Sequence, residues 1–424
     1  MTLSEFLEAE WCPALGCTEP AAIAYAAATA AGQARGPIRR VALVCDPRIY
    51  KNCYAVGIPG TDRRSGILWA LGLGALLPDP SYKLECFRLV TADIVAGAKR
   101  LIDAGALAVE VDRGRMQLYI DVTVERESGS GRAVIEMEHT RLMRVERDGR
   151  TIFEAAAGFE DKTADARLYA ASLSFSEAIA VARSAAPSDR EFLRRSANDN
   201  IAICEHGLSL MPPGFLSPLE TDALTRIGRL VAAGVHARMC GEEMIVMSLA
   251  GSGNKGITAS VPVALWGRHL GVPIDRLDEA LALSCLVTSG VTQQLGALSA
   301  MCGAAIAGGI GVACAIVYLE GGGPDEMSSA TTNIVGNLAG IICDGAKIGC
   351  SLKTMTGVDA AFRAASLALA GVTIPHTDGI VGRDGASSLG NLGRLAKRGM
   401  MRIDDEILDI MQSKLRCTAC STED

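Results

Sequence analysis

Two cysteine-bearing segments decide the fold expected for this chain: residues 302–319, CGAAIAGGIGVACAIVYL, and residues 331–353, TTNIVGNLAGIICDGAKIGCSLK. The first segment opens with Cys302, and the second places Cys343 and Cys350 on either side of the turn DGAKIG. Cysteines beside glycines, in apolar segments of a chain without an export signal, are typical of metal ligands rather than disulfides. Three thiolates suit an iron–sulfur cluster that keeps one iron open to substrate.

The spacing of these thiols leaves a structural alternative open. Cys343 and Cys350 are seven residues apart, so on a continuous helix they would lie two turns, or about 10 Å, apart. Gly345 and Gly349 instead predict a turn that brings both thiols toward one centre, with Cys302 supplied by the preceding helix. The spacing matches no zinc-finger signature. Because buried cysteine is also a common packing residue, packing is the alternative for all three.

The apolar run around Cys302 predicts a central helix. Residues 295–319 are twenty-five residues without a charge, which is long enough to span a bilayer. The run is rich in Gly and Ala, however, and no Lys or Arg lies close to either end. A helix buried on all sides by other helices is therefore the better interpretation. The whole chain, 49% hydrophobic but only 4% aromatic, likewise favours close-packed helices.

Length and charge exclude several classes of protein. At 424 residues the chain is long enough for two domains and a large core. A net charge of −7 gives no electrostatic reason to expect a nucleic-acid or membrane partner. The N-terminus, MTLSEFLEAEW, lacks the order of a signal peptide, so we expect a cytoplasmic protein whose fourteen cysteines are reduced thiols or ligands. The large apolar fraction is compatible with a homodimer.

Hydrophobic patterns predict an α+β fold with two domains. A smaller α/β domain over residues 35–165 is expected to contribute to the substrate pocket, and residues 1–34 and 166–424 are expected to form a larger, mainly α-helical, cluster-binding domain. The smaller domain combines strand patterns with two helix patterns, and its last strands form hairpins. The predicted strands are residues 38–45, 107–111, 118–125 and 132–139 with a further pair around 147–150, and the predicted helices are residues 67–76 and 92–104.

The motif GCTEP near the N-terminus places a thiol beside a helix end. Thr18 or Glu19 can cap the helix, so Cys17 lies where backbone N–H groups and the helix dipole stabilise a thiolate. A buried cysteine in a loop is the structural alternative. Cys17, His139 and Lys51 are the polar candidates for proton transfer in catalysis.

The motif GSGNKG, residues 251–256, predicts a flexible loop that leads into a helix through Thr258. Such a loop offers backbone N–H groups to a carboxylate, although a plain turn has the same composition. The turn PGT at residues 59–61 is a second candidate for binding the carboxylate. The predicted substrate-binding residues are Thr18, Glu19, Asn52, Thr61, Thr140, Ser252, Gly253, Asn254 and Lys255.

Motifs spread over nearly the whole chain carry a family resemblance. PALGCTEPAAIAYAAA, IPGT, EHT, GSGNKGITASVPV, LSAMC, TNIVGNLAGIICDGAKIGC and DGIVGRD occur in one order between Pro13 and about Lys414. In these motifs the chain resembles the L-cysteine desulfidase family, which is related to the iron–sulfur L-serine dehydratases. GCTEP and ICDGAKxGC are the specific motifs, and GSGNKG is less so. The resemblance implies a [4Fe–4S] cluster and conversion of L-cysteine to pyruvate, ammonia and sulfide without pyridoxal phosphate.

The resemblance also implies a set of thiols. Cys17, Cys302, Cys343 and Cys350 stand at the shared positions. We expect Cys302, Cys343 and Cys350 to hold the cluster. Cys17 is then either a fourth ligand that substrate displaces or an acid–base group beside the cluster.

The expected reaction is β-elimination from a small L-amino acid. A base removes a proton from Cα while an open iron takes the leaving group from Cβ as a Lewis acid. L-Cysteine is the expected substrate, L-serine or another β-hydroxy amino acid is the alternative, and a non-catalytic iron–sulfur sensor is the alternative from a different class. Two features lie outside the motifs. Arg63 and Arg64 either select a second acidic group or are solvated, and Cys417 with Cys420 either blocks the open iron or is unused.

Overall fold

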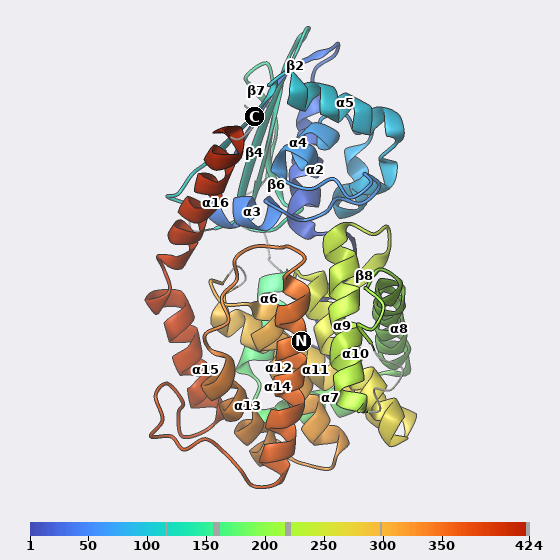
Figure 1. The fold of residues 1–424 in the computed structure, drawn as a ribbon, viewed down its shortest axis with the longest axis vertical. Coiled ribbons are helices and arrows are strands. Elements are labelled where there is room, and N and C mark those ends of the chain that lie inside the picture. The colour runs from blue at the N-terminus through green and yellow to red at the C-terminus, as the bar shows by residue number, and fades with distance from the viewer. Residues whose placement is uncertain (116, 156–161, 217–221, 297–298, 421–424) are drawn as a thin grey trace.

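The computed structural model describes all residues except 116, 156–161, 217–221, 297–298 and 421–424, and it describes residues 415–420 by their backbone alone. The side chains of Cys417 and Cys420 therefore lie outside the described part of the chain. The fold is α+β, as predicted, with a smaller half built on a sheet and a larger helical half (Figure 1). The helices are α1 (Leu3–Glu10), α2 (Thr18–Ala31), α3 (Pro47–Cys53), α4 (Ile67–Gly74), α5 (Ala92–Asp103), α6 (Lys162–Ser172), α7 (Phe175–Arg183), α8 (Pro187–Ser209), α9 (Ala223–Cys240), α10 (Gly253–Leu270), α11 (Ile274–Leu295), α12 (Gly303–Leu319), α13 (Pro324–Leu338), α14 (Cys350–Leu369), α15 (Gly385–Arg394) and α16 (Ile403–Cys420), with a 3₁₀ helix η1 (Pro80–Leu89) and a π-helical turn η2 (Leu395–Gly399). The strands are β1 (Trp11–Leu15), β2 (Ile38–Cys45), β3 (Leu107–Val111), β4 (Tyr119–Arg126), β5 (Gly129–Glu136), β6 (Leu142–Arg147), β7 (Arg150–Glu154) and β8 (Ile245–Leu249).

The smaller half is a six-stranded sheet in the order β3-β2-β4-β5-β6-β7. β2 and β3 run parallel and the other neighbours are antiparallel. The strands predicted at residues 38–45 and 107–111 are confirmed with the same bounds. Alternation along β2 buries Val41, Leu43 and Cys45 on one face, and Figure 1 shows α2, α4 and α5 together on one side of the sheet.

Helix α2 packs unusually closely on this sheet because it is rich in alanine. All of its residues are buried. A Cβ on Gly74 would lie 2.4 Å from the Cα of Ala24, and a Cβ on Gly131 would lie 2.0 Å from the carbonyl oxygen of Ala30. Small residues on both sides therefore let α2 approach its neighbours closely along its middle and its last turn.

The larger half is organised around α12, as the sequence predicts. Every residue from Ala305 to Leu319 is buried, and α12 packs against α10, α11, α13 and α14. The charge-free run at residues 295–319 is not one helix, however, because α11 ends at Leu295 and α12 begins at Gly303. Gly296, with φ of +96°, stops α11. Among the described helices, none combines the length and the apolarity that a membrane crossing requires.

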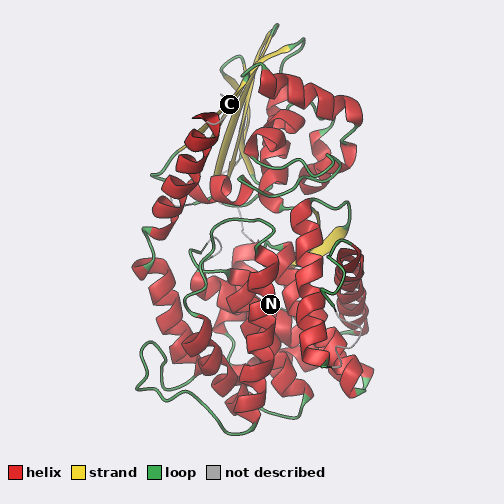
Figure 2. Cartoon of the chain, in the orientation of Figure 1, coloured by secondary structure: helices red, strands yellow, loops and turns green. Residues whose placement is uncertain are grey.

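The N-terminal segment divides between the two cores. Leu3, Trp11 and Cys17 join the helical core, whereas α2 joins the sheet core. The sequence placed all of residues 1–34 with the helices; the packing assigns α2 to the sheet half instead. The sequence patterns do not predict β1. This strand pairs antiparallel with β8 and forms a two-stranded ribbon at the junction of the two halves (Figure 2). At the other end of the chain, α16 returns to the sheet half and buries Leu408 there.

Two helices of the site begin at a capping side chain. DPRIYKNC forms α3, because the carboxylate of Asp46 caps the N–H groups of Arg48 and Ile49 at 2.8 and 3.2 Å. GSGNKG is not a flexible loop, because Ser252 is an N-cap and α10 begins at Gly253. The capping hydrogen bond offsets the conformational freedom of Gly253 and Gly256, the two glycines of this motif that lie in the helix.

Candidate active site

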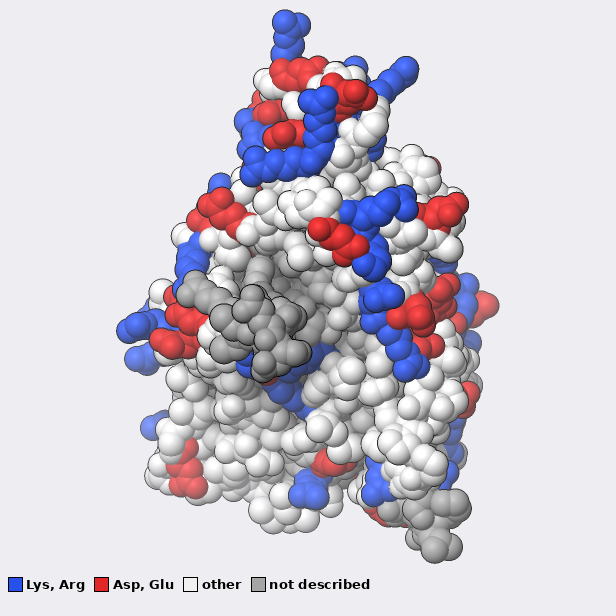
Figure 3. Space-filling model, turned by 45° about the horizontal axis from the view of Figure 1, so that its top comes forward, with Lys and Arg blue, Asp and Glu red and all other residues white. Residues whose placement is uncertain are grey.

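A cavity of about 580 Å³ lies between the two halves. Its walls include the first residues of α2, α10, α12 and α14, together with α3 and the segment after β5. Because four helices begin here, the positive ends of their dipoles all favour a bound anion. On the face shown in Figure 3, basic and acidic side chains are mixed, and basic atoms are also visible inside a recess near the centre.

Cys302, Cys343 and Cys350 all line this cavity. Cys302 is the N-cap of α12, and Cys350 is the first residue of α14. Met301 and Ile342 form an antiparallel bridge, and the N–H groups of Cys302 and Cys343 donate hydrogen bonds of 2.8 and 2.7 Å across it. The segments before α12 and after α13 are thus paired directly, which places their cysteines side by side.

The turn between Cys343 and Cys350 depends on Gly345. Its φ is +94°, and a Cβ there would lie 2.2 Å from the carbonyl oxygen of Lys51, so only glycine fits. The carboxylate of Asp344 accepts hydrogen bonds from Lys347 and Lys353. The glycine-rich turn predicted from DGAKIG therefore forms, and it is fixed against α3.

The chemistry of the three thiols fits an iron–sulfur cluster, because thiolate is the usual protein ligand of such clusters. Across the described residues, no three Cys, His, Asp or Glu side chains converge where one ion could bind. The ligands of a cluster bind different irons, so their sulfurs lie further apart than the ligands of one ion. Burial, followed by the neighbouring Cys343 and Cys350, raises the pKa of Cys302 to about 12. These thiols must lose protons to bind iron, which makes binding depend on pH.

A buried carboxylate, Glu19, organises the opposite wall. It accepts hydrogen bonds of 2.9 Å from the thiol of Cys17, the hydroxyl of Thr18 and the amide of Asn52. Burial is the largest effect and raises the pKa of Glu19, but the neighbouring His139 and these hydrogen bonds outweigh it, so the pKa lies below its usual value. Glu19 is therefore ionised at neutral pH.

The structure corrects the expectation that Cys17 is a thiolate. Cys17 is the N-cap of α2, as the motif predicts, but its sulfur makes no cap hydrogen bond and donates to Glu19 instead. Burial, and then the negative charge of Glu19, raise the pKa of Cys17 well above its usual value. The adjacent carboxylate cancels the helix-end effect, and Cys17 is a neutral thiol.

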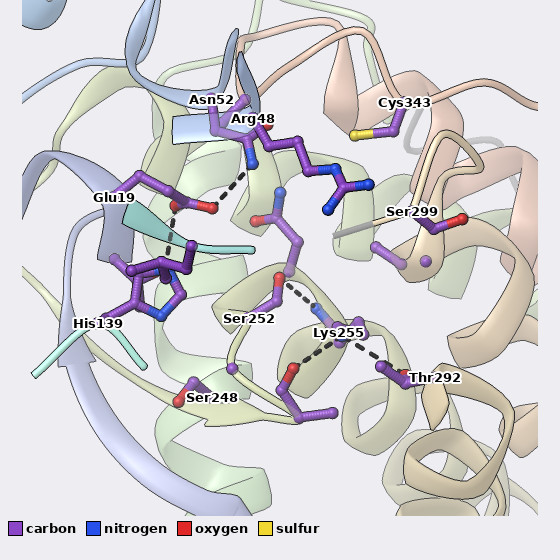
Figure 4. Close-up of a pocket in the computed structure, with 18 of the residues that line it drawn as sticks. Glu19, Arg48, Asn52, His139, Ser248, Ser252, Lys255, Thr292, Ser299 and Cys343 are labelled. Carbon is purple, nitrogen blue, oxygen red and sulfur yellow. Dashed lines mark hydrogen bonds between the residues drawn. The ribbon is translucent and has the colours of Figure 1, made fainter. Parts of the chain in front are cut away.

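His139 lies beside this carboxylate. Its Nε2 is buried and has no hydrogen-bond partner among the described residues, and it lines the cavity. Burial lowers the pKa of His139, with Glu19 opposing the shift, so the imidazole is neutral at neutral pH. Figure 4 shows Glu19 and His139 on one side of the cavity and Cys343 and Ser299 on the other.

Lys255 lies in the first turn of α10, near the cysteines. Its ammonium donates to the carbonyl oxygen of Ala250 at 2.8 Å and to the hydroxyl of Thr292 at 3.4 Å. A Cβ on Gly303, the residue after Cys302, would lie 4.0 Å from Nζ. Burial, and then the positive charge of Arg167, lower the pKa of Lys255 to about 7.

The other residues predicted for the site either line the cavity or lie away from it. Lys51 lines the cavity, but its ammonium already binds the carbonyl oxygen of Cys343 and the carboxylate of Asp404. Thr61 bonds instead to the carbonyl oxygen of Ile58, at 2.6 Å, and neither it nor Gly253 is part of the cavity wall. Thr18, Asn52, Thr140, Ser252 and Asn254 do line the cavity.

Sequence reasoning missed several polar residues of the cavity. Glu10 is buried and forms a 2.9 Å ion pair with Arg167, and both line the cavity with Arg238. The helices that carry these residues have ordinary sequence patterns, so the local sequence does not show that they reach the cavity. Their contacts in the folded structure do. Arg63 and Arg64 do not line the cavity; Arg63 pairs with Glu242 at 3.6 Å.

Comparisons with known proteins match most of the chain. A family model described as serine dehydratase alpha chain matches residues 122–409. A UPF0597 protein of Geobacter sulfurreducens is 37% identical, over 97% of this chain and 98% of its own length. UPF0597 proteins of Clostridium perfringens (strain SM101) and Elusimicrobium minutum are 35% and 32% identical, over 96% and 98% of this chain and 97% and 99% of their own lengths.

Proposed function

Because this chain belongs to the serine dehydratase alpha-chain family, we propose that it is an iron–sulfur lyase that catalyses β-elimination from a small L-amino acid. The first substrate in this proposal is L-cysteine, and the products are pyruvate, ammonia and sulfide. Family membership supports the coarser part of the proposal, a dehydratase-like lyase with an iron–sulfur cofactor. The cavity supports the residue roles that follow.

The observation that carries the proposal is the arrangement of two unlike walls around one cavity. Cys302, Cys343 and Cys350 line this cavity, and Figure 4 shows Glu19 and His139 across the cavity from Cys343. The three cysteines are the residues that would hold a [4Fe–4S] cluster. When bound, the cluster supplies a Lewis-acidic iron with an open position, which polarises the bond from Cβ to the leaving group.

His139 is the base in this proposal. His139 lines the cavity, and its Nε2 has no hydrogen-bond partner among the described residues. Its imidazole is neutral at neutral pH, which suits it to take the proton from Cα. The electron pair of the broken C–H bond forms the Cα–Cβ double bond, and the C–S bond breaks with its pair on sulfur. Glu19 stabilises the imidazolium that results, because its carboxylate is ionised and adjacent.

Lys255 is the proton donor to the leaving group in this proposal. It lies beside Gly303 on the cysteine side of the cavity, and with a pKa of about 7 both its charged and neutral forms are populated at neutral pH. Its ammonium protonates the departing sulfide. The 2-aminoacrylate left behind tautomerises and hydrolyses to pyruvate and ammonia without further help from the protein.

L-Serine is the second candidate substrate, because the matching family model is described as serine dehydratase. The same base and the same proton donor would then eliminate water from the β-carbon. The two candidates differ only in the leaving atom.

A single experiment separates these possibilities. The protein is reconstituted anaerobically with iron and sulfide, freed of excess sulfide, and given L-cysteine, L-serine or D-cysteine. We expect pyruvate and sulfide in equal amounts from L-cysteine and little product from D-cysteine. Pyruvate from L-serine with none from L-cysteine assigns the second candidate. A fully reconstituted protein that releases pyruvate from no amino acid is a binding protein or a sensor, and the proposal fails.

A further inference from the structure

Arg238 is a buried cation whose hydrogen-bond partners, among the described residues, are all neutral. It lies in the last turn of α9, is 2% exposed and lines the cavity. A guanidinium has five N–H donors, and within the described residues Arg238 has two acceptors: Asn254 Oδ1 at 2.9 Å and the carbonyl oxygen of Gly16 at 2.8 Å. Its Nε has none, and no ion pair involving it occurs in the described part of the chain.

Two helix N-termini contribute to the surroundings of Arg238. Asn254 belongs to the first turn of α10, and Gly16 directly precedes the N-cap of α2, so two helix N-termini meet at this guanidinium. The nearby Cys17 is a neutral thiol, and, within the described residues, the ionised Glu19 that it contacts forms no ion pair with Arg238. Arginine stays protonated in proteins, and a buried charge without a counter-ion is strongly unfavourable.

Gly253 permits this arrangement. A Cβ at that position would lie 2.4 Å from Nε of Arg238, so any larger residue would push the start of α10 off the guanidinium. The predicted role of Gly253 in substrate binding is thereby changed: it does not touch the cavity, but it lets the helix end and the guanidinium share one site.

We propose that Arg238, together with the N-termini of α2 and α10, binds the α-carboxylate of the substrate. The inference rests on the proposed function, because it assigns one group of the amino acid to one part of the cavity. With the carboxylate at Arg238, its negative charge neutralises the buried cation. Recognition then requires a carboxylate, and an amide or amine analogue leaves the guanidinium unpaired.

The test measures binding apart from turnover. L-Alanine has no leaving group, so its binding to the anaerobically reconstituted protein is followed by calorimetry and compared with that of L-alaninamide, which lacks the carboxylate. We expect L-alaninamide to bind at least about tenfold more weakly than L-alanine, and the Kd for L-alanine to rise roughly 10- to 100-fold in Arg238→Gln. Arg238→Lys keeps the charge but loses the fork of donors, so an intermediate Kd is expected. Arg226→Gln, an exposed position on the same helix, is the control and keeps the parent Kd.

Equal binding of L-alanine and L-alaninamide by the parent protein overturns the inference, and this comparison holds even when Arg238→Gln does not fold. An unchanged Kd for L-alanine in folded Arg238→Gln overturns it as well. The proposed function fails in a different way. If the protein binds L-alanine through Arg238 but releases no pyruvate from any amino acid, the carboxylate site stands and the proposed elimination reaction is refuted.

Discussion

The ammonium of Lys51 donates a 2.8 Å hydrogen bond to the carbonyl oxygen of Cys343. The same nitrogen lies 2.5 Å from Oδ1 of Asp404, and the Lys51 side chain is only 1% exposed. A residue of α16 thus holds a lysine of α3, and that lysine holds the cysteine turn. The sheet half of the molecule therefore fixes one of the proposed cluster ligands, which belongs to the helical half.

Replacing Lys51 by Met tests this connection. The change frees the Cys343 carbonyl and removes the strongest partner of Asp404, so we expect a loss of about 2–3 kcal/mol in unfolding free energy. Less iron per chain should be retained after reconstitution. Lys99→Met, which removes an exposed pair with Asp103, should cost about 0.5 kcal/mol or less. Parent-level iron in folded Lys51→Met would show that the lysine does not position the turn.

Gly345→Ala addresses the same turn from its backbone. The substitution places a Cβ at a φ of +94° and 2.2 Å from the Lys51 carbonyl oxygen, so it should cost roughly 2 kcal/mol or more. Gly340→Ala is the matched control, because its Cβ would meet nothing within 4 Å, and it should change stability by about 0.5 kcal/mol at most. Denaturant unfolding and iron content measure both effects. Equal behaviour of the two variants contradicts the packing of the turn.

Single replacements of Cys302, Cys343 and Cys350 by Ala should each lower the iron bound per chain after anaerobic reconstitution. Cys17→Ala should retain iron, because Cys17 is a neutral thiol bonded to Glu19. Cys314 is a buried packing residue of α12, so Cys314→Ala should also retain it. Loss of iron in Cys17→Ala with retention in Cys350→Ala refutes the ligand assignment.

His139→Gln should lower kcat/KM for the proposed elimination by about 10²- to 10⁴-fold, the usual contribution of a positioned base. The base acts in its neutral form, so activity is lost as the pH falls through the pKa of His139. Because burial lowers that pKa below its usual value of about 6.5, the acid limb of the profile should lie below pH 6.5. Iron content and melting temperature should stay at parent values. A variant that keeps the parental acid limb shows that another group is the base.

Local sequence signals were sufficient for elements whose residues stabilise each other at short range. Alternation of side chains predicted the strand at residues 38–45 with its observed bounds, and the uncharged, small-residue run predicted a buried helix ending at Leu319. The glycines of DGAKIG predicted the turn that brings Cys343 and Cys350 to one cavity. The same signals failed at GSGNKG, because the Ser252 side chain caps the helix and offsets the flexibility of the glycines.

The charged environment of the site could not be predicted in this way. Lys51 and Asp404 are 353 residues apart, and Arg238 and Gly16 are 222 residues apart. No periodicity relates such pairs, because ion pairs and buried donors are matched only after the two halves have packed.

The sequence by itself determined the α+β class, the buried central helix and the thiol-bearing turn. Only the tertiary structure decided that α2 packs on the sheet, that Cys17 is a neutral thiol and that Arg238 forms no ion pair within the described residues. Each of these depends on the burial and the electrostatic field that distant segments create together.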